Sequence, residues 1–183
     1  MGEADAAAAV ARARDAVGSA VHTLSEASAR TETLAEFVPS RRVIGIPRAP
    51  RMRVIGPVWR LGVLLLDADR HVYGTGRVIR AERAARKSVT AESVAVQRAY
   101  REAAVRGGIA EGATVVFDAE PVELDAEALA ADATSGPLVL TTGPDGSVEV
   151  GVRWNPSRDD ALIPFASYLA ERVDLLVNPP QGA

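Results

Sequence analysis

Apolar positions recur with a helical spacing at the start of the chain. Residues 3–37 are rich in Ala, Arg, Glu and Leu, with no proline before Pro39, which predicts one long helix. The stripe repeats in heptads, at Val10, Val17, Leu24, Thr31 and Val38, with Ala13, Ala20, Ala27 and Leu34 three residues after the first four. Such a seam suits an antiparallel helix pair or a homodimer, and equally a single helix lying on its own sheet.

After the helix, the pattern changes to short extended runs. Prolines at 39, 47, 50 and 57 flank residues 43–46 and 52–55, which predicts edge strands or an extended arm. The apolar run 59–66 predicts a central strand, and turn formers at 67–70 join it to residues 71–79 in a β-hairpin. Gly74 and Gly76 share one face of the second strand, which indicates close approach by another element, or a bulge.

The second half of the chain alternates between helices and strands. A helix is expected at 91–106, a strand at 114–117 that 121–124 extends, and a short helix at 125–131. A hairpin follows at 138–142 and 147–154, and a last helix at 165–177. The hairpins favour an α+β fold, with a mostly antiparallel sheet packed with helices. We expect an N-terminal helical arm at 1–38 and an α+β domain at 39–183.

Composition narrows the class of protein. The chain has 183 residues, of which 48% are hydrophobic and 25% charged, as is typical of a soluble domain. It contains no cysteine, which excludes disulfides, thiol nucleophiles and cysteine-built metal sites. The N-terminus lacks the basic start and long apolar stretch of a secretory signal, and later apolar runs are short. These features predict a cytoplasmic protein without a membrane partner.

Charge is segregated along the chain although the net charge is only -3. Residues 41–87 carry a net charge of +9 and residues 88–183 a net charge of -9. The basic segment fits nucleic-acid phosphates, or an acidic partner that includes the chain's own second half. An aromatic content of 4% disfavours nucleic acid, since base stacking needs several aromatic rings. The arginines that we take as binding candidates are Arg51, Arg53, Arg60, Arg77 and Arg80.

The strongest chemical cluster lies at the predicted hairpin turn. Asp67, Asp69 and His71 offer two carboxylates and an imidazole, which suits a divalent cation or metal-assisted hydrolysis. Tyr73 or Arg77 would then orient an anionic substrate. Aspartates in turns more often bond to their own backbone, so we expect neither a metal nor a cofactor. A P-loop, a dinucleotide fingerprint, a Gly-x-Ser-x-Gly elbow and a His-Glu-x-x-His motif are all absent.

Several segments resemble those of a group of small, uncharacterised proteins from GC-rich bacterial genomes, some of which are labelled glutaminase. They include residues 42–45, 60–66, 104–108 and the Pro179-Pro180 tail. Serine-type glutaminases use a Ser-x-x-Lys pair, but no serine lies three residues before the single lysine, Lys87. The resemblance therefore supplies no catalytic residue.

Together these observations favour a non-catalytic binding or self-assembly module of a soluble bacterial protein. We expect a homo-oligomer, with a dimer through the N-terminal helix as its simplest form. The alternative is a small metal-assisted hydrolase whose site lies near Asp67, Asp69 and His71. Whether the chain is an enzyme stays open, and the missing motifs favour the non-catalytic interpretation.

Overall fold

The computed structural model describes residues 2–43, 46–83, 92–131, 136–143, 145–155 and 162–180. The chain folds into two compact units, each assembled from separate stretches of sequence. The first unit comprises residues 1–30, 59–74 and 120–183, and the second comprises residues 31–58 and 75–119. The fold class is α+β, as predicted. The division into an arm at 1–38 and a domain at 39–183 stays a prediction.

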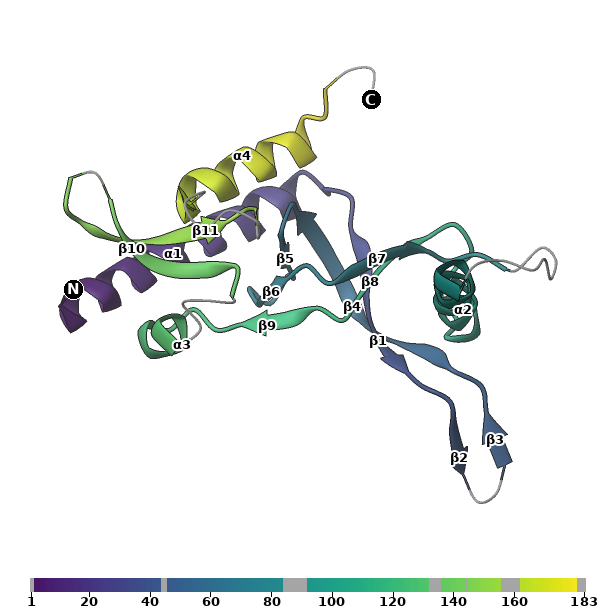
Figure 1. Ribbon diagram of the computed structural model, residues 1–183. Helices are drawn as coiled ribbons and strands as arrows, with labels where there is room; N and C mark the ends of the chain where they lie inside the picture. Colours follow the sequence, from purple (N-terminus) through teal and green to yellow (C-terminus); the bar gives the residue numbers. More distant parts are fainter. Residues whose placement is uncertain are drawn as a thin grey trace. The chain divides into compact units, whose positions relative to one another are not determined.

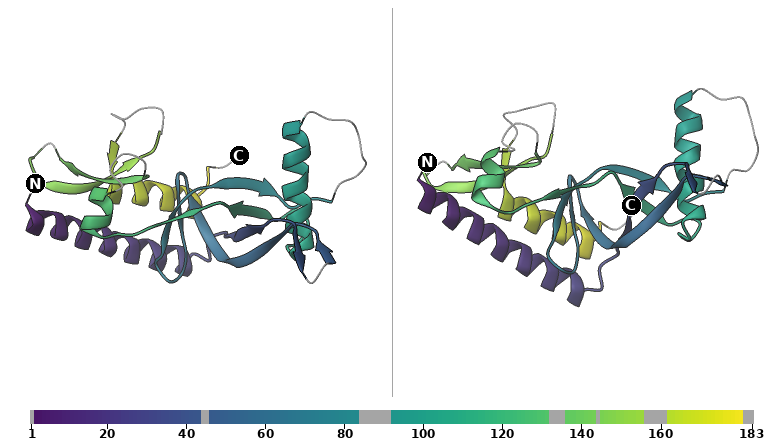
Figure 2. Two further views of the ribbon diagram at one scale, coloured as in Figure 1. Left: turned by 60° about the horizontal axis from the view of Figure 1, so that its bottom comes forward. Right: turned by 90° about the horizontal axis from the view of Figure 1, so that it is seen from below.

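The first unit combines helices with two antiparallel sheets. Its elements are α1 (Glu3–Glu26), the end of β4 (Arg51–Leu61), β5 (Leu64–Leu66), β6 (Val72–Gly74), β9 (Glu120–Val122), α3 (Ala126–Ala131), β10 (Leu138–Thr142), β11 (Val148–Arg153), β12 (Leu162–Pro164) and α4 (Phe165–Val177). The strands pair in the orders β4-β5-β6-β9 and β10-β11-β12. Helices α1 and α4 lie side by side, and α1 runs along β11 (Figures 1 and 2).

The second unit packs one helix against four strands. It contains β1 (Glu32–Val38), β2 (Arg41–Val43), β3 (Ile46–Arg48), most of β4, β7 (Arg77–Arg80), α2 (Glu92–Arg106) and β8 (Thr114–Phe117). The strand order is β7-β8-β1-β4, and β2 pairs with β3 as a separate ribbon. Strands β1 and β8 are parallel, and the other ladders of the described strands are antiparallel. Strand β4 contributes residues to both units.

The N-terminal helix is shorter than the sequence predicts. Helix α1 ends at Glu26, and residues 32–38 form strand β1 instead of the last helical turns. Ser28 adopts a left-handed φ of 47°, its N–H donates to the Ser25 carbonyl, and the Ala29 N–H donates to the Leu24 carbonyl. This pair of bonds is the Schellman end of a helix, a position that glycine usually fills. The sequence does not indicate this helix end, because serine occupies the position where glycine would be the usual signal.

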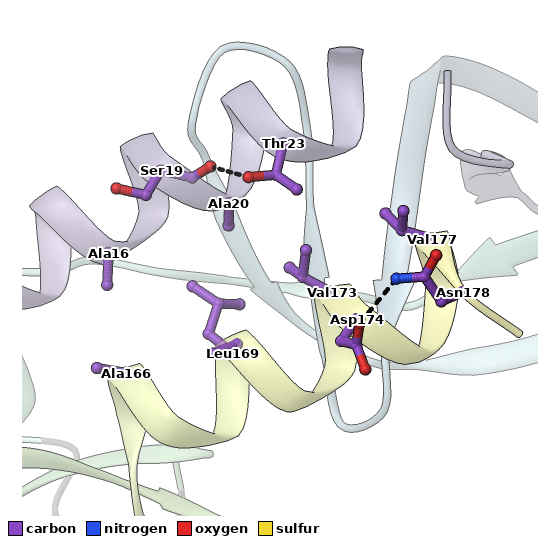
Figure 3. A pocket seen from close by; sticks show the side chains of 11 residues that line it. Ala16, Ser19, Ala20, Thr23, Ala166, Leu169, Val173, Asp174, Val177 and Asn178 are labelled. Carbon is purple, nitrogen blue, oxygen red and sulfur yellow. Dashed lines mark hydrogen bonds between the residues drawn. The ribbon is translucent and has the colours of Figure 1, made fainter. Parts of the chain in front are cut away.

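The heptad seam of α1 packs inside its own chain. Val10, Val17 and Leu24 are at most 3% exposed, and they join a core cluster with residues of β5, β11 and α4. The stripe is therefore confirmed from Val10 to Leu24, whereas Thr31 and Val38 lie beyond the end of the helix. Helix α1 packs on β11 of its own chain and also on a second helix. The neighbouring helix is α4, which runs in the same direction as α1 rather than antiparallel to it (Figure 3).

Tyr168 ties α4 to the turn between β4 and β5. Its hydroxyl donates to the Leu61 carbonyl at 3.1 Å and accepts the Val63 N–H at 2.9 Å. Between them, Gly62 has a φ of 69°, and a Cβ there would lie 2.2 Å from the tyrosine oxygen. Only glycine fits this turn, which also divides the predicted strand 59–66 into the end of β4 and β5.

Two further strand predictions change in detail. The predicted strand 71–79 divides into β6 and β7, because Gly76 crosses the backbone of β8 where a Cβ would lie 2.2 Å from the Phe117 carbonyl oxygen. This confirms the expected close approach. The predicted piece 52–55 belongs to an eleven-residue strand that continues through Pro57. A register shift in the β1–β4 ladder lies beside that proline, and such irregularities accommodate a residue without an N–H.

The prediction that residues 121–124 extend the strand at 114–117 is wrong, because β9 pairs with β6 whereas β8 pairs with β1 and β7. The predicted piece 43–46 lies partly outside the described residues, and its ends belong to β2 and β3. Other predictions agree closely with the structure. The hairpin at 138–142 and 147–154 corresponds to β10 and β11, and the last helix matches α4. The expected start of the helix at 91 lies outside the described residues, and α2 follows from residue 92. None of the described helices combines the length and apolar character that crossing a bilayer requires.

Candidate functional site

Asp67 organises the turn that joins β5 to β6. Its Oδ1 accepts the backbone N–H groups of Asp69 and His71, each at 2.9 Å. Its carbonyl accepts the N–H of Arg70, which has a left-handed φ of 71°. A side-chain oxygen that bonds the backbone two residues further on forms an Asx turn. One carboxylate oxygen is therefore committed to shaping the loop.

The second oxygen of Asp67 orients two aromatic side chains. Oδ2 lies 2.8 Å from Nδ1 of His71 and accepts the Tyr73 hydroxyl at 3.2 Å. The Asp67 side chain is 18% exposed and that of His71 is 65% exposed. Because Nδ1 faces the aspartate, Nε2 is the ring atom that remains to meet a ligand.

Electrostatics at this corner follow from the same contacts. The hydrogen bond to Asp67 raises the pKa of His71 above its ordinary value of 6.5, and the charges of Asp67 and Asp69 raise it further. Burial is the main cause that raises the pKa of Tyr73 above 10.0, and the neighbouring Asp67 adds to it. The corner therefore holds an imidazole that protonates more readily than usual and a neutral phenol.

A cation-binding geometry is present in outline. One potential ligand atom from each of Asp67, Asp69 and His71 lies within 4.8 Å of the others. Oxygen and imidazole ligands suit divalent ions. However, both Asp67 oxygens already accept hydrogen bonds within the turn, and Nδ1 of His71 faces one of them. A cation would have to compete with these bonds for the same lone pairs.

A cavity of about 600 Å³ opens beside the corner within the first unit. Strand pairing of β6 with β9 places Val72 opposite Val122 and Tyr73 opposite Pro121, and α1 closes another side. The wall consists of Arg14, Val17, Arg70, His71, Val72, Tyr73, Pro121, Val122, Glu123 and Leu124. Apolar walls with a few convergent polar groups, in a volume of about 300–1,000 Å³, are typical of small-molecule sites.

The five predicted binding arginines do not form one cluster. Arg60 belongs to the first unit and the other four belong to the second. Arg53 pairs with Glu36, Arg77 bonds Tyr100 and Asp118, and Arg80 donates to the Gly112 carbonyl. Arg51 and Arg60 are exposed on β4. Three of the candidates therefore hold the second unit together.

These contacts support the internal interpretation of the charge segregation. In the second unit, Arg77 and Arg83 of the basic segment pair with Asp118 and Glu111 of the acidic half, at 3.4 and 3.7 Å. All four side chains are more than half exposed, so each pair contributes about 0–1 kcal/mol. Part of the basic segment is thus matched by the chain's own acidic residues.

A second concavity lies between α1 and α4 (Figure 3). Its volume is about 380 Å³, and its walls are mostly small or aliphatic side chains such as Ala16, Ala20 and Leu169. The hydroxyl of Thr23 donates to the Ser19 carbonyl, and the amide of Asn178 donates to Asp174. Because these polar groups already form local hydrogen bonds, they are poorly placed to bind a ligand in this groove.

The sequence predicts only part of the cavity. It identifies His71 and names Tyr73 as a helper, and the structure brings both to the cavity wall. It misses Arg14, Arg70 and Glu123, which come from segments that are more than 50 residues apart. The position of Arg70 in a turn of type Asp-x-Asp-Arg is a signal for the turn, but no local pattern connects it to Arg14.

Comparison with known proteins adds no identity. No family model, no curated protein and no solved structure matches this chain.

Proposed function

We propose that the protein is a non-catalytic binding module whose ligand is a small molecule held in the cavity beside the β5–β6 turn. The observation that supports this most directly is the combination of volume and wall. Val17 and Val72 supply a buried apolar floor, and Arg14, Arg70 and His71 supply polar groups around it. A concave apolar site with convergent polar groups and a shifted pKa is the usual form of a ligand site.

The test is ¹H–¹⁵N NMR of the full chain with a panel of small aromatic fragments, both neutral and anionic. We expect fragment-induced shifts at Val72, Val122 and Leu124, with dissociation constants of about 1 mM. Val122→Trp should abolish them by filling the cavity, whereas Val94→Trp, at an exposed position of α2, should not. Shifts that ignore the Val122 substitution, or none near the cavity, would refute the proposal.

A metal-assisted hydrolase is the second candidate, and the convergence of Asp67, Asp69 and His71 favours it. Asp69 is the best position to substitute in a test of this candidate. Its backbone N–H donates to Asp67 and shapes the turn, whereas its side chain does not take part in the turn. A hydrolase predicts that Zn²⁺ or Mn²⁺ binds the full chain and that Asp69→Asn weakens binding by tenfold or more. Calorimetric titration measures this, with Glu123→Gln as a neighbouring acidic control. Equal affinities in the parent and Asp69→Asn would remove this candidate.

The proposal also includes a cytoplasmic, homo-oligomeric protein, as the sequence predicts. The lack of cysteine supports the reducing compartment. The seam of α1 is occupied within its own chain, so a dimer through this helix would use other faces of it. Likeness to the uncharacterised bacterial group remains a prediction from the sequence.

A further inference from the structure

Two arginines line the cavity although 56 positions separate them in the sequence. Arg14 lies on α1, and its Nε donates to the Leu124 carbonyl at 3.0 Å, which holds the guanidinium at the rim. The Arg70 guanidinium reaches α1 at Gly18, where a Cβ would lie 3.9 Å from Cζ. Positions 14 and 18 are about one helical turn apart on the same face of α1, so both arginines border the side of the cavity that this face forms.

These two cations have no ion-pair partner in the part of the chain that the structure describes. One carboxylate, that of Glu123, also lines the cavity. Among the side chains that line the cavity, two guanidinium groups outnumber one carboxylate, while the Asp67 carboxylate at the adjoining turn bonds His71 and Tyr73. Two like charges that line one cavity repel each other, and an anion bound beside them would relieve that repulsion.

We propose that the ligand of this cavity is an organic monoanion, with a carboxylate bound by Arg14 and Arg70 and an apolar body resting on Val72 and Val122. This inference rests on the proposed binding function and adds the chemical class of the ligand. Guanidinium groups match a carboxylate in geometry as well as in charge.

The experiment compares benzoate with benzamide, which have similar shapes but differ in charge. Both are titrated into the full chain and followed by the NMR shifts of Val72 and Val122. We expect benzoate to bind about tenfold more tightly than benzamide. Arg14→Gln and Arg70→Gln should each reduce that preference several-fold. Arg70→Lys should retain only part of it, because lysine keeps the charge but not the planar geometry. Arg30→Gln, at an exposed arginine outside the cavity wall, should leave it unchanged.

The outcomes separate this inference from the proposed function. Equal binding of benzoate and benzamide would overturn the anion assignment while leaving a binding cavity. A benzoate preference that survives both glutamine substitutions would overturn the role of the two arginines. Tighter binding of phenyl phosphate than of benzoate would overturn the monoanion. If no probe or fragment shifts the cavity residues, both proposals fail.

Discussion

The two oxygens of the Asp67 carboxylate have separate roles. Oδ1 bonds the backbone of its own turn, and Oδ2 bonds the side chains of His71 and Tyr73. The first role depends on an oxygen acceptor, and the second depends also on negative charge. An asparagine keeps an oxygen for the turn but removes the charge, so substitution can separate them.

We predict that Asp67→Asn lowers the pKa of His71 toward 6.5, because it removes the hydrogen-bonded carboxylate that raises it. A raised folded-state pKa stabilises the fold below 6.5, and this contribution disappears as the pH rises through the folded-state value. The parent should therefore exceed Asp67→Asn in stability more at about pH 6 than at about pH 9. NMR titration and denaturant unfolding at both pH values measure these effects, and Asp69→Asn should lower the pKa of His71 less, because Asp69 contributes only its charge.

The outcome that contradicts this prediction is an unchanged His71 titration in Asp67→Asn.

The sequence identified Asp67, Asp69 and His71 because they are close together in the chain. It did not reveal that Asp67 contacts Tyr73 or that the corner borders a cavity. The cavity depends on the pairing of β6 with β9 and on α1 beside them, which brings together segments far apart in the sequence.

At the scale of elements, the end of α1 shows how a local signal can be hidden. Ser28 occupies the left-handed position of a Schellman motif. An L-residue with a side chain pays a steric cost there that glycine does not. The helix nevertheless ends here, because residues 32–38 pair with both β4 and β8. Two ladders outweigh the modest helix propensity of that segment.

Ser28→Gly should stabilise the protein by about 0.5–1 kcal/mol, because glycine adopts the left-handed conformation without strain. The expected rise in Tm is about 1–4 °C for a chain of this size. Ser25→Gly is the matched control, since the same substitution inside the last helical turn should destabilise by about 0.5–1 kcal/mol. Calorimetry measures both, and equal effects of the two substitutions would contradict this account of the helix end.

At the scale of the whole molecule, the apolar seam of α1 could have packed against a second copy of the chain or within its own chain. The structure places Val10, Val17 and Leu24 in the core of the first unit, so the pattern does not by itself indicate a dimer. Removing residues 1–38 takes away α1 and also β1, which lies between β8 and β4. Loss of an oligomer after that deletion would therefore report unfolding as readily as a lost interface. Substitutions on exposed faces of α1 are the better probe of self-association.

The structure of the whole molecule also explains part of the charge segregation along the sequence. Basic and acidic halves of the sequence meet at β7, β8 and the loop before β8, where Arg77 and Arg83 pair with Asp118 and Glu111. Arg14 and Arg70 have a different environment, beside a cavity with a single carboxylate. Arginines of the same apparent class in the sequence therefore divide into structural residues and candidate ligand-binding residues according to their neighbours in space.

The sequence by itself determined the fold class, the stripe of α1, the hairpin of β10 and β11 and the turn at Asp67. These depend on periodicity and turn chemistry, which act over a few neighbouring residues. Only the tertiary structure decided that the α1 seam packs within its own chain, that β1 replaces the end of the helix, and that Arg14, Arg70 and His71 line one cavity. Such contacts join residues far apart in the sequence, and their free energy comes from burial and strand pairing that no local pattern records.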